Sequence, residues 1–196
     1  NALEIAVLSL PDGKSSIDLE TMQQAFQFRL NGITTTDFYD LTSAFIKSMR
    51  GSQTDAALYW LGRLLYSGVD PLYIARRVVI QAAEDVGLAN PQALQVAVAA
   101  KQAVEFVGMP EAKIPLAEAV IYLCESPKSN SACKAINAAL ETVKNTAALP
   151  VPGQLKNSTG LYVNPLDNPG VQLQYLPPKL RGATFYRPQN AGAEEK

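Results

Sequence analysis

Two arginines and two acids stand in a segment that otherwise reads as a buried helix, "DPLYIARRVVIQAAEDVGLANPQAL", at residues 70–94. Arg76 and Arg77 are adjacent, and so are Glu84 and Asp85, one turn before a glycine. Neighbouring side chains on a helix point about 100° apart, so the two acids do not form a carboxylate pair by themselves. These side chains therefore suit binding contacts rather than acid–base catalysis.

The rest of the sequence offers no catalytic constellation around these charges. There is no histidine, which removes the usual general base and the commonest zinc ligand. The phosphate-binding patterns G-x-x-x-x-G-K-[ST] and G-x-G-x-x-G are both absent. Cys124 and Cys133 form no C-x-x-C motif, and we expect them to be packing residues in a reducing cytoplasm. We predict no catalytic, metal-binding or cofactor-binding residue in this chain.

The position of the four charges along the helix narrows their roles. Glu84 and Asp85 fall in the last turn, where the helix dipole disfavours acids by about 0.3–1 kcal/mol each, so cations from other helices or another subunit are expected beside them. Arg76 and Arg77 lie too far along the same helix for one-turn pairing. The two arginines can form ion pairs within the domain, contact another subunit or bind phosphate, and the sequence leaves these alternatives open.

Two further segments have residue types that favour contact. "DAALYWLGRLLYSG" carries Tyr59, Trp60 and Arg63, which are types enriched at interface hot spots, although ordinary core packing explains them as well. "SPKSNSACKAINAAL" begins a helix, and unpaired N–H groups at a helix start can hold an anion. The alternative there is simple capping by a serine. The candidate phosphate contacts are Lys47, Arg50, Lys128, Ser129 and Asn130.

The spacing of apolar residues predicts an all-α fold. The dipeptides DP at 70–71 and NP at 90–91 are typical of helix starts, and Gly68, Gly87 and Gly108 fall where left-handed helix ends are expected. Short connections favour antiparallel or steeply crossed neighbours. The helix at 91–107 has alanines on two sides and is expected at the centre. The predicted helices are residues 18–29, 37–49, 54–67, 71–86, 91–107, 115–125 and 131–145.

The fourth of these helices has an apolar stripe at helical spacing. Its members are Leu72, Ala75, Val79, Ala82, Ala83 and Val86.

The sequence changes character near residue 148. Seven of the 13 prolines lie beyond that point, a density that no helix tolerates. Leucines, valines and tyrosines among them are too frequent for a disordered tail. We expect residues 149–196 to form an extended proline-rich arm that lies along a surface.

Composition sets limits on the class of protein. The chain is 47% hydrophobic and 18% charged with a net charge of −1, which is typical of a soluble globular protein without global attraction to nucleic acid or anionic lipid. No apolar run approaches the ~18 residues that a membrane span requires. The first ten residues lack signal-peptide features.

The helical segments together resemble a known family. "FYDLTSAFIKSMRGSQTDAALYWLGRLL", "DPLYIARRVVIQAAEDVGLANPQALQVAVAAKQAVEFVGMPEAKIPLAEAVIYL" and "PKSNSACKAINAAL" are similar to the C-terminal region of the replication-associated recombination protein A family, also called MgsA. The eukaryotic relative is the Werner-helicase-interacting protein. The resemblance covers about residues 36–150, and "QYLPPKLRGATFYRP" resembles the family's tail.

The resemblance implies an AAA+ ATPase whose nucleotide-binding core, with ATP and Mg²⁺, precedes this chain. Residues 1–30 resemble the end of the AAA+ lid, and residues 31–148 resemble the clamp-loader collar that joins subunits. The resemblance further implies a homotetramer in the cytoplasm, associated with the nucleoid. Single-strand-binding protein and DNA at stalled replication forks are the expected partners, and no membrane is.

A DNA-binding helical module is the alternative function. Its phosphate contacts would come from a local basic patch of Lys47, Arg50, Arg63, Arg76, Arg77 and Lys128.

Overall fold

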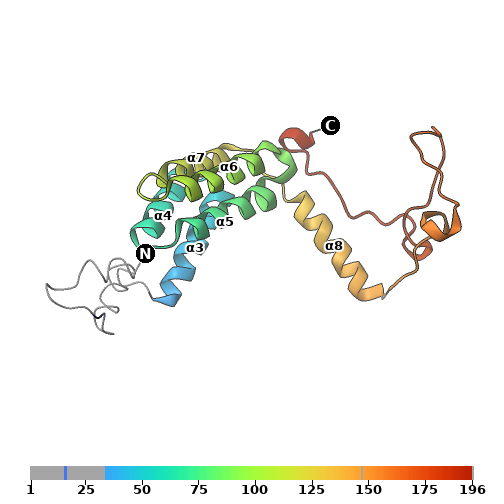
Figure 1. Cartoon of the computed structure of the whole chain (residues 1–196), viewed down its shortest axis with the longest axis horizontal. Helices are drawn as coiled ribbons and strands as arrows, with labels where there is room; N and C mark the ends of the chain where they lie inside the picture. Colours follow the sequence, from blue (N-terminus) through green and yellow to red (C-terminus); the bar gives the residue numbers. More distant parts are fainter. Residues whose placement is uncertain (1–15, 17–33, 147, 196) are drawn as a thin grey trace. The chain divides into compact units, whose positions relative to one another are not determined.

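The computed structural model describes residue 16, residues 34–146 and residues 148–195. Every regular element within these ranges is helical, which confirms the all-α prediction (Figure 1). The predicted helix at 18–29 and the lid-like segment 1–30 lie outside the described residues, apart from residue 16. The helices are α3 (Thr35–Arg50), α4 (Thr54–Tyr66), α5 (Pro71–Gln81), α6 (Gln92–Val107), α7 (Lys113–Glu125) and α8 (Ser131–Thr146). A π-helical turn, Ala82–Val86, continues α5, and a 3₁₀ turn, Gly87–Ala89, follows it.

The chain forms two compact units. The first contains α3 to α7 and also includes the last residues of the chain, from Gln189 onward. The second comprises Ser131–Pro188 and contains α8. The predicted domain boundary at 148 stays a prediction.

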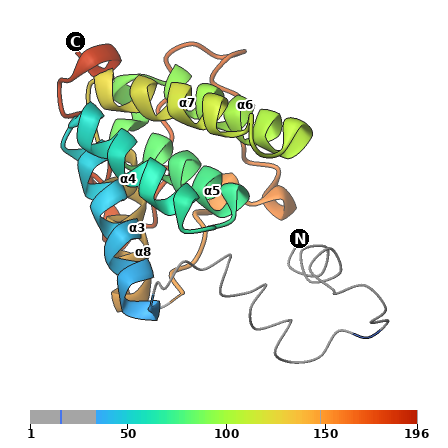
Figure 2. The ribbon, with the colours of Figure 1, turned by 90° about the vertical axis from the view of Figure 1, so that its left-hand side faces the viewer.

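The core of the first unit is built around α7, which contacts each of α3, α4, α5 and α6 (Figure 2). Its fully buried side chains include Leu116, Val120 and Leu123. The expectation that the 91–107 helix is central was wrong. Helix α6 buries one face only, while Val98 is 38% and Phe106 is 90% exposed. Alanines on two sides of a helix permit close packing on both sides, but only one face of α6 packs against neighbouring helices.

Local capping explains where several helices begin. Thr34 and Asp37 form a reciprocal capping box at the start of α3, and hydrogen bonds from Thr34 lower the pKa of Asp37. The Asp70 side chain accepts from the Leu72 amide, and Pro71 occupies the first turn of α5. The predicted start at 70–71 is therefore confirmed.

The predicted helix start at residues 90–91 does not depend on a side-chain cap. Asn90 provides no side-chain cap to α6. Its amide nitrogen instead donates to the Tyr122 hydroxyl at 3.2 Å and to the Ser126 hydroxyl at 3.0 Å. The amide thus connects the start of α6 to the end of α7, because acceptors from α7 lie within reach.

The buried stripe of α5 is rotated from the predicted one. Leu72 and Val79 only pack partly against the core, and Ala83 is exposed. The helix faces α3 on one side: the Phe38 and Tyr73 rings lie 5.3 Å apart, and Arg50 bonds Asp85. Both pairs are 35 residues apart, so α3 and α5 run in the same direction. The buried positions are Ile74, Ala75, Val78, Gln81, Ala82, Asp85 and Val86.

The second unit contains α8 and short 3₁₀ turns at Gly153–Leu155, Asn157–Thr159 and Pro178–Leu180. Among the described residues no α-helix follows Thr146, as the proline density predicts. The extended surface path of the arm stays a prediction.

Gly87 ends the π turn at a position where only glycine fits. Its φ of 50° and ψ of −130° are unfavourable for any other residue, and an added Cβ would lie 2.6 Å from the Ser129 carbonyl oxygen. Gly108 also has a positive φ of 68°, but nothing lies within 4 Å of its Cβ position. The helix ends at both glycines are confirmed, although neither glycine adopts a left-handed helical ψ.

We predict that Gly87→Ala lowers the free energy of unfolding more than Gly108→Ala does. Both substitutions carry backbone strain, but only the first forces Ser129 to move, which adds about 1–3 kcal/mol. Urea denaturation followed by circular dichroism measures the difference. Equal losses for the two variants would show that the contact between Gly87 and Ser129 is not tight.

Candidate functional site

One arginine of α3 binds both acids of the π turn. Arg50 Nε donates to the two carboxylate oxygens of Asp85, each at 3.0 Å, and Nη2 donates to Glu84 Oε1 at 3.4 Å. The Asp85 side chain is only 9% exposed. The prediction that these acids find a cation on another helix is correct. The Arg50 side chain is 49% exposed, and its predicted phosphate contact stays a prediction.

Lys128 holds the end of α7. Its ammonium donates to the carbonyl oxygens of Leu123, Cys124 and Ser126 at 2.7, 3.0 and 2.7 Å, and to the Ser52 hydroxyl at 2.8 Å. These acceptors include carbonyls that a helix end leaves unpaired. Burial lowers the pKa of Lys128. Three ammonium hydrogens thus already have four acceptors, so the geometry favours a capping role over phosphate binding.

The predicted anion site before α8 is filled by the chain's own C-terminal residues. Asn130 donates its backbone N–H to Gln189 Oε1 at 3.0 Å, and the two side-chain amides bond at 2.8 Å. Ser129 donates its N–H to the Asp85 carbonyl at 2.8 Å and its hydroxyl to the buried Glu194 carboxylate. Sequence reasoning missed Gln189 and Glu194, because nothing local links them to residues 129–130.

Arg76 and Arg77 form no ion pair with any residue that the structure describes. Arg76 is exposed, with its guanidinium carbon 5.9 Å from the centre of the Tyr73 ring. Arg77 is half-buried, and its Nε has no hydrogen-bond partner. The predicted intradomain ion pairs are therefore not found in the described part of the chain. Contact with another subunit and phosphate binding stay open.

The aromatic segment of α4 divides between core and surface. Trp60 packs partly against the core, while Tyr59 is 56% exposed and its ring centre lies 4.9 Å from that of Trp60. Arg63 donates to the Tyr59 hydroxyl at 3.5 Å. Lys47 is exposed on α3. The interface prediction therefore applies to Tyr59 and Arg63 more than to Trp60.

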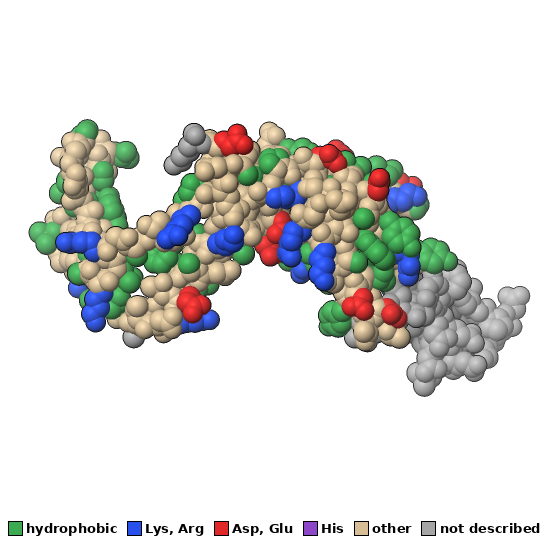
Figure 3. Space-filling view, turned by 180° about the vertical axis from the view of Figure 1, so that it is seen from behind, with side chains coloured by type: hydrophobic (Ala, Val, Ile, Leu, Met, Phe, Trp, Pro, Cys, Tyr) green, Lys and Arg blue, Asp and Glu red, His purple; other side chains and the backbone are tan. Residues whose placement is uncertain are grey.

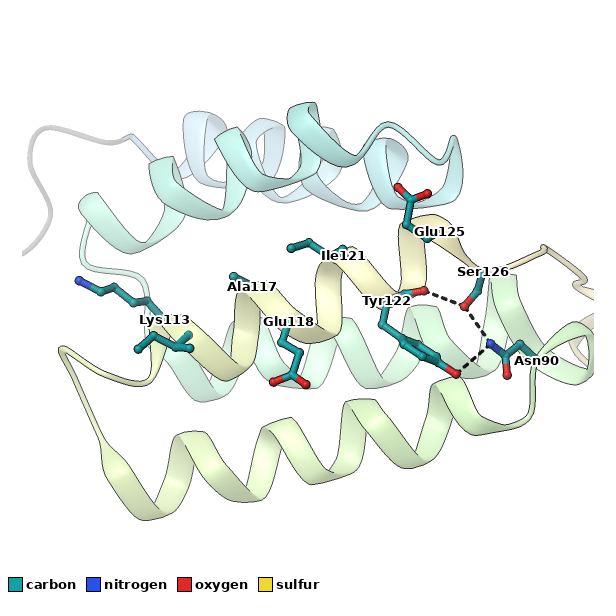
Figure 4. Close-up of a pocket in the computed structure, with 9 residues that line it drawn as sticks. Asn90, Lys113, Ala117, Glu118, Ile121, Tyr122, Glu125 and Ser126 are labelled. Atoms are coloured by element: carbon teal, nitrogen blue, oxygen red, sulfur yellow. Dashed lines mark hydrogen bonds between the residues drawn. The ribbon is translucent and has the colours of Figure 1, made fainter.

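An open groove of about 780 Å³ lies along the outward face of α7 (Figure 4). Its apolar residues include Ile114 and Ile121, which are 62% and 41% exposed. Glu118 and Glu125 stand on the same face at helical spacing. We call it the α7 groove. It is lined by Asn90, Lys113, Ile114, Ala117, Glu118, Ile121, Tyr122, Glu125 and Ser126.

A second apolar surface lies on α8, within the second unit. Ile136, Leu140 and Val143 are 57%, 52% and 63% exposed. They recur at intervals of four and three residues and form one stripe. We call this stripe the α8 ridge. Sequence reasoning named neither surface as a site, because apolar residues at helical spacing are expected in the core.

The described residues show no other chemistry. They contain no cluster of three potential metal ligands, and none of their helices is long and apolar enough to cross a membrane. On the face in Figure 3, basic side chains near the middle have acidic ones beside them.

Comparison with known proteins agrees with this picture. Residues 51–196 match the family described as MgsA AAA+ ATPase C terminal. The chain belongs to this family. The earlier resemblance to replication-associated recombination protein A is thereby confirmed.

Named relatives of the MgsA C-terminal family include replication-associated recombination protein A of Bacillus subtilis. It is 43% identical, with all of this chain and 50% of that protein covered. The Escherichia coli K12 protein of the same name is 40% identical over 81% of this chain and 38% of its own length. ATPase WRNIP1 of Dictyostelium discoideum is 46% identical over 62% of this chain and 14% of its own length. The chain thus spans half or less of the length of these relatives.

Arg50→Ala should destabilise the first unit, because the substitution removes the guanidinium that bonds the buried Asp85 carboxylate. We expect a loss of about 1–3 kcal/mol in the free energy of unfolding. The matched control is Lys101→Ala, which breaks the exposed pair between Lys101 and Glu105 and should cost at most about 0.5 kcal/mol. Chemical denaturation measures both. If the two variants lose the same free energy, the ion pair at the π turn is not structurally important.

Proposed function

We propose that this chain is the oligomerisation module of an AAA+ ATPase that acts in replication-fork maintenance and recombination. Its chemistry is contact between subunits, and its assembly is a homotetramer. The module itself hydrolyses no ATP, since the sequence lacks a phosphate-binding loop and a histidine base.

The observation that carries this proposal is the exposure of large apolar side chains on the helices. Phe106 at the end of α6 is 90% exposed, and Ile114, at the start of α7, is 62% exposed. The α7 groove and the α8 ridge add two further apolar surfaces. Large exposed apolar surfaces on a folded domain usually mark sites of protein–protein contact.

The family relation supports the larger context. Its description names an AAA+ ATPase, and ATP with Mg²⁺ would bind in a core outside this chain. The relatives' names refer to replication-associated recombination. We propose that the full-length protein works on DNA at stalled forks with single-strand-binding protein, in the cytoplasm beside the nucleoid.

Direct DNA binding by this chain is the weaker candidate. Two of the predicted phosphate contacts, Arg50 and Lys128, are already bonded within the first unit. Lys47, Arg63 and Arg76 are exposed, but the chain's net charge is −1. Non-specific affinity for DNA depends on phosphate contacts and falls steeply with salt, so this surface favours only weak binding.

Light scattering at micromolar concentration tests the proposal. We predict a mass four times the chain's 21.1 kDa, nearly unchanged at moderate salt, because apolar contact is less sensitive to screening than charge pairing is. Added duplex DNA should not change this mass. A folded monomer at concentrations up to ~100 μM, near the weak end of specific association, would refute the proposed role.

A further inference from the structure

We infer that the α8 ridge of one chain seats in the α7 groove of a second chain. The inference rests on the proposed self-assembly and identifies the two surfaces that carry it. Each surface belongs to a different compact unit.

The ridge is the most apolar side of α8, and it is open. The side of the helix that is partly buried carries Ala135, Ala139, Thr142 and Thr146, none of which is large and apolar. The exposed side carries Ile136, Leu140 and Val143. A helix normally buries its apolar stripe and exposes its polar side. The reversed pattern indicates that the ridge has a partner outside its own unit.

The groove has a shape that such a ridge fits. Ile114 and Ile121 are seven residues apart, and Ala117, at helical spacing between them, lines the same groove. Ile136 and Val143 are also seven residues apart, with Leu140 between them. Both spacings correspond to about 10.5 Å along a helix. The small side chain between two large ones leaves a hole, and Leu140 is the matching knob.

Charge selects the ridge as the occupant. The outward face of α7 presents two carboxylates, Glu118 and Glu125, and one ammonium, Lys113, so pairing two grooves would bring four carboxylates together with only two ammonium groups. Lys144 follows Val143 and flanks the ridge at helical spacing. A ridge in the groove brings this ammonium to a face that carries more carboxylates than ammonium groups, whereas two paired ridges would leave the groove uncovered.

The contact joins two different patches and is therefore heterologous. Each chain offers one ridge and one groove, so repeated contacts form a ring when the rotation between copies closes. Four copies in such a ring satisfy every ridge and every groove. This arrangement fits the tetramer proposed above.

Complementation between two disabled variants tests the inference in the chain as it exists. Leu140→Asp disables the ridge, and Ile121→Asp disables the groove. Both side chains are about half exposed, at 52% and 41%, so both variants should fold. The control is Leu166→Asp, since Leu166 is 88% exposed and belongs to neither surface. Circular dichroism checks folding, and native mass spectrometry identifies the species formed.

We expect each variant alone to assemble at least ten times more weakly than the wild type, and the control to behave as the wild type does. An equimolar mixture of the two variants should give a species that contains one copy of each, because one intact ridge then meets one intact groove. Loss of assembly without this mixed species would overturn the inference, as would wild-type assembly by either variant. If both variants still form tetramers, the contact between ridge and groove is wrong, but the proposed self-assembly stands. If the wild type is a monomer, the proposed self-assembly itself is wrong.

Discussion

The Asp85 carboxylate, almost fully buried in the π turn, must have a cation beside it, and Arg50 of α3 supplies that cation. An unpaired charge at this depth would be strongly destabilising. The same residue's carbonyl oxygen accepts the Ser129 N–H at 2.8 Å, and Gly87 passes close to the Ser129 carbonyl. The π turn thus joins α3 to the segment that precedes α8. π-Helical turns next to α-helices are often found at functional sites.

Hydrogen bonds of Ser129 and Asn130 connect the same segment to residues 189–194. Glu194 accepts the Ser129 hydroxyl, and Gln189 bonds Asn130. Residues 131–188 therefore leave and re-enter the first unit at one place. Because Asn130 and Gln189 are bonded, residues 131–188 form a closed segment, and the entropic cost of closing a segment rises only slowly with its length.

Local patterns predicted the helices of residues 34–146 well, and long-range bonds account for what they missed. Asp70 and Pro71 begin α5 as expected, because a cap depends on two neighbouring residues. The partner of Asp85 is 35 residues away, and no spacing rule selects Arg50 over Lys47. Asn90 looked like a cap but bonds Tyr122, which comes from another helix. The sequence did not indicate the α7 groove, because apolar residues occur on every face of α7 and do not distinguish its buried side from its exposed side.

Concentration-dependent hydrogen exchange tests most directly whether α7 and α8 are contact surfaces. Contact slows the opening of a helix, so its amides exchange more slowly in an assembly than in a free chain. Our account predicts that dilution from tetramer to monomer accelerates exchange in residues 113–126 and 131–146, while exchange in the Arg50 and Asp85 region stays constant. Equal exchange at both concentrations in residues 113–126 and 131–146 would contradict it.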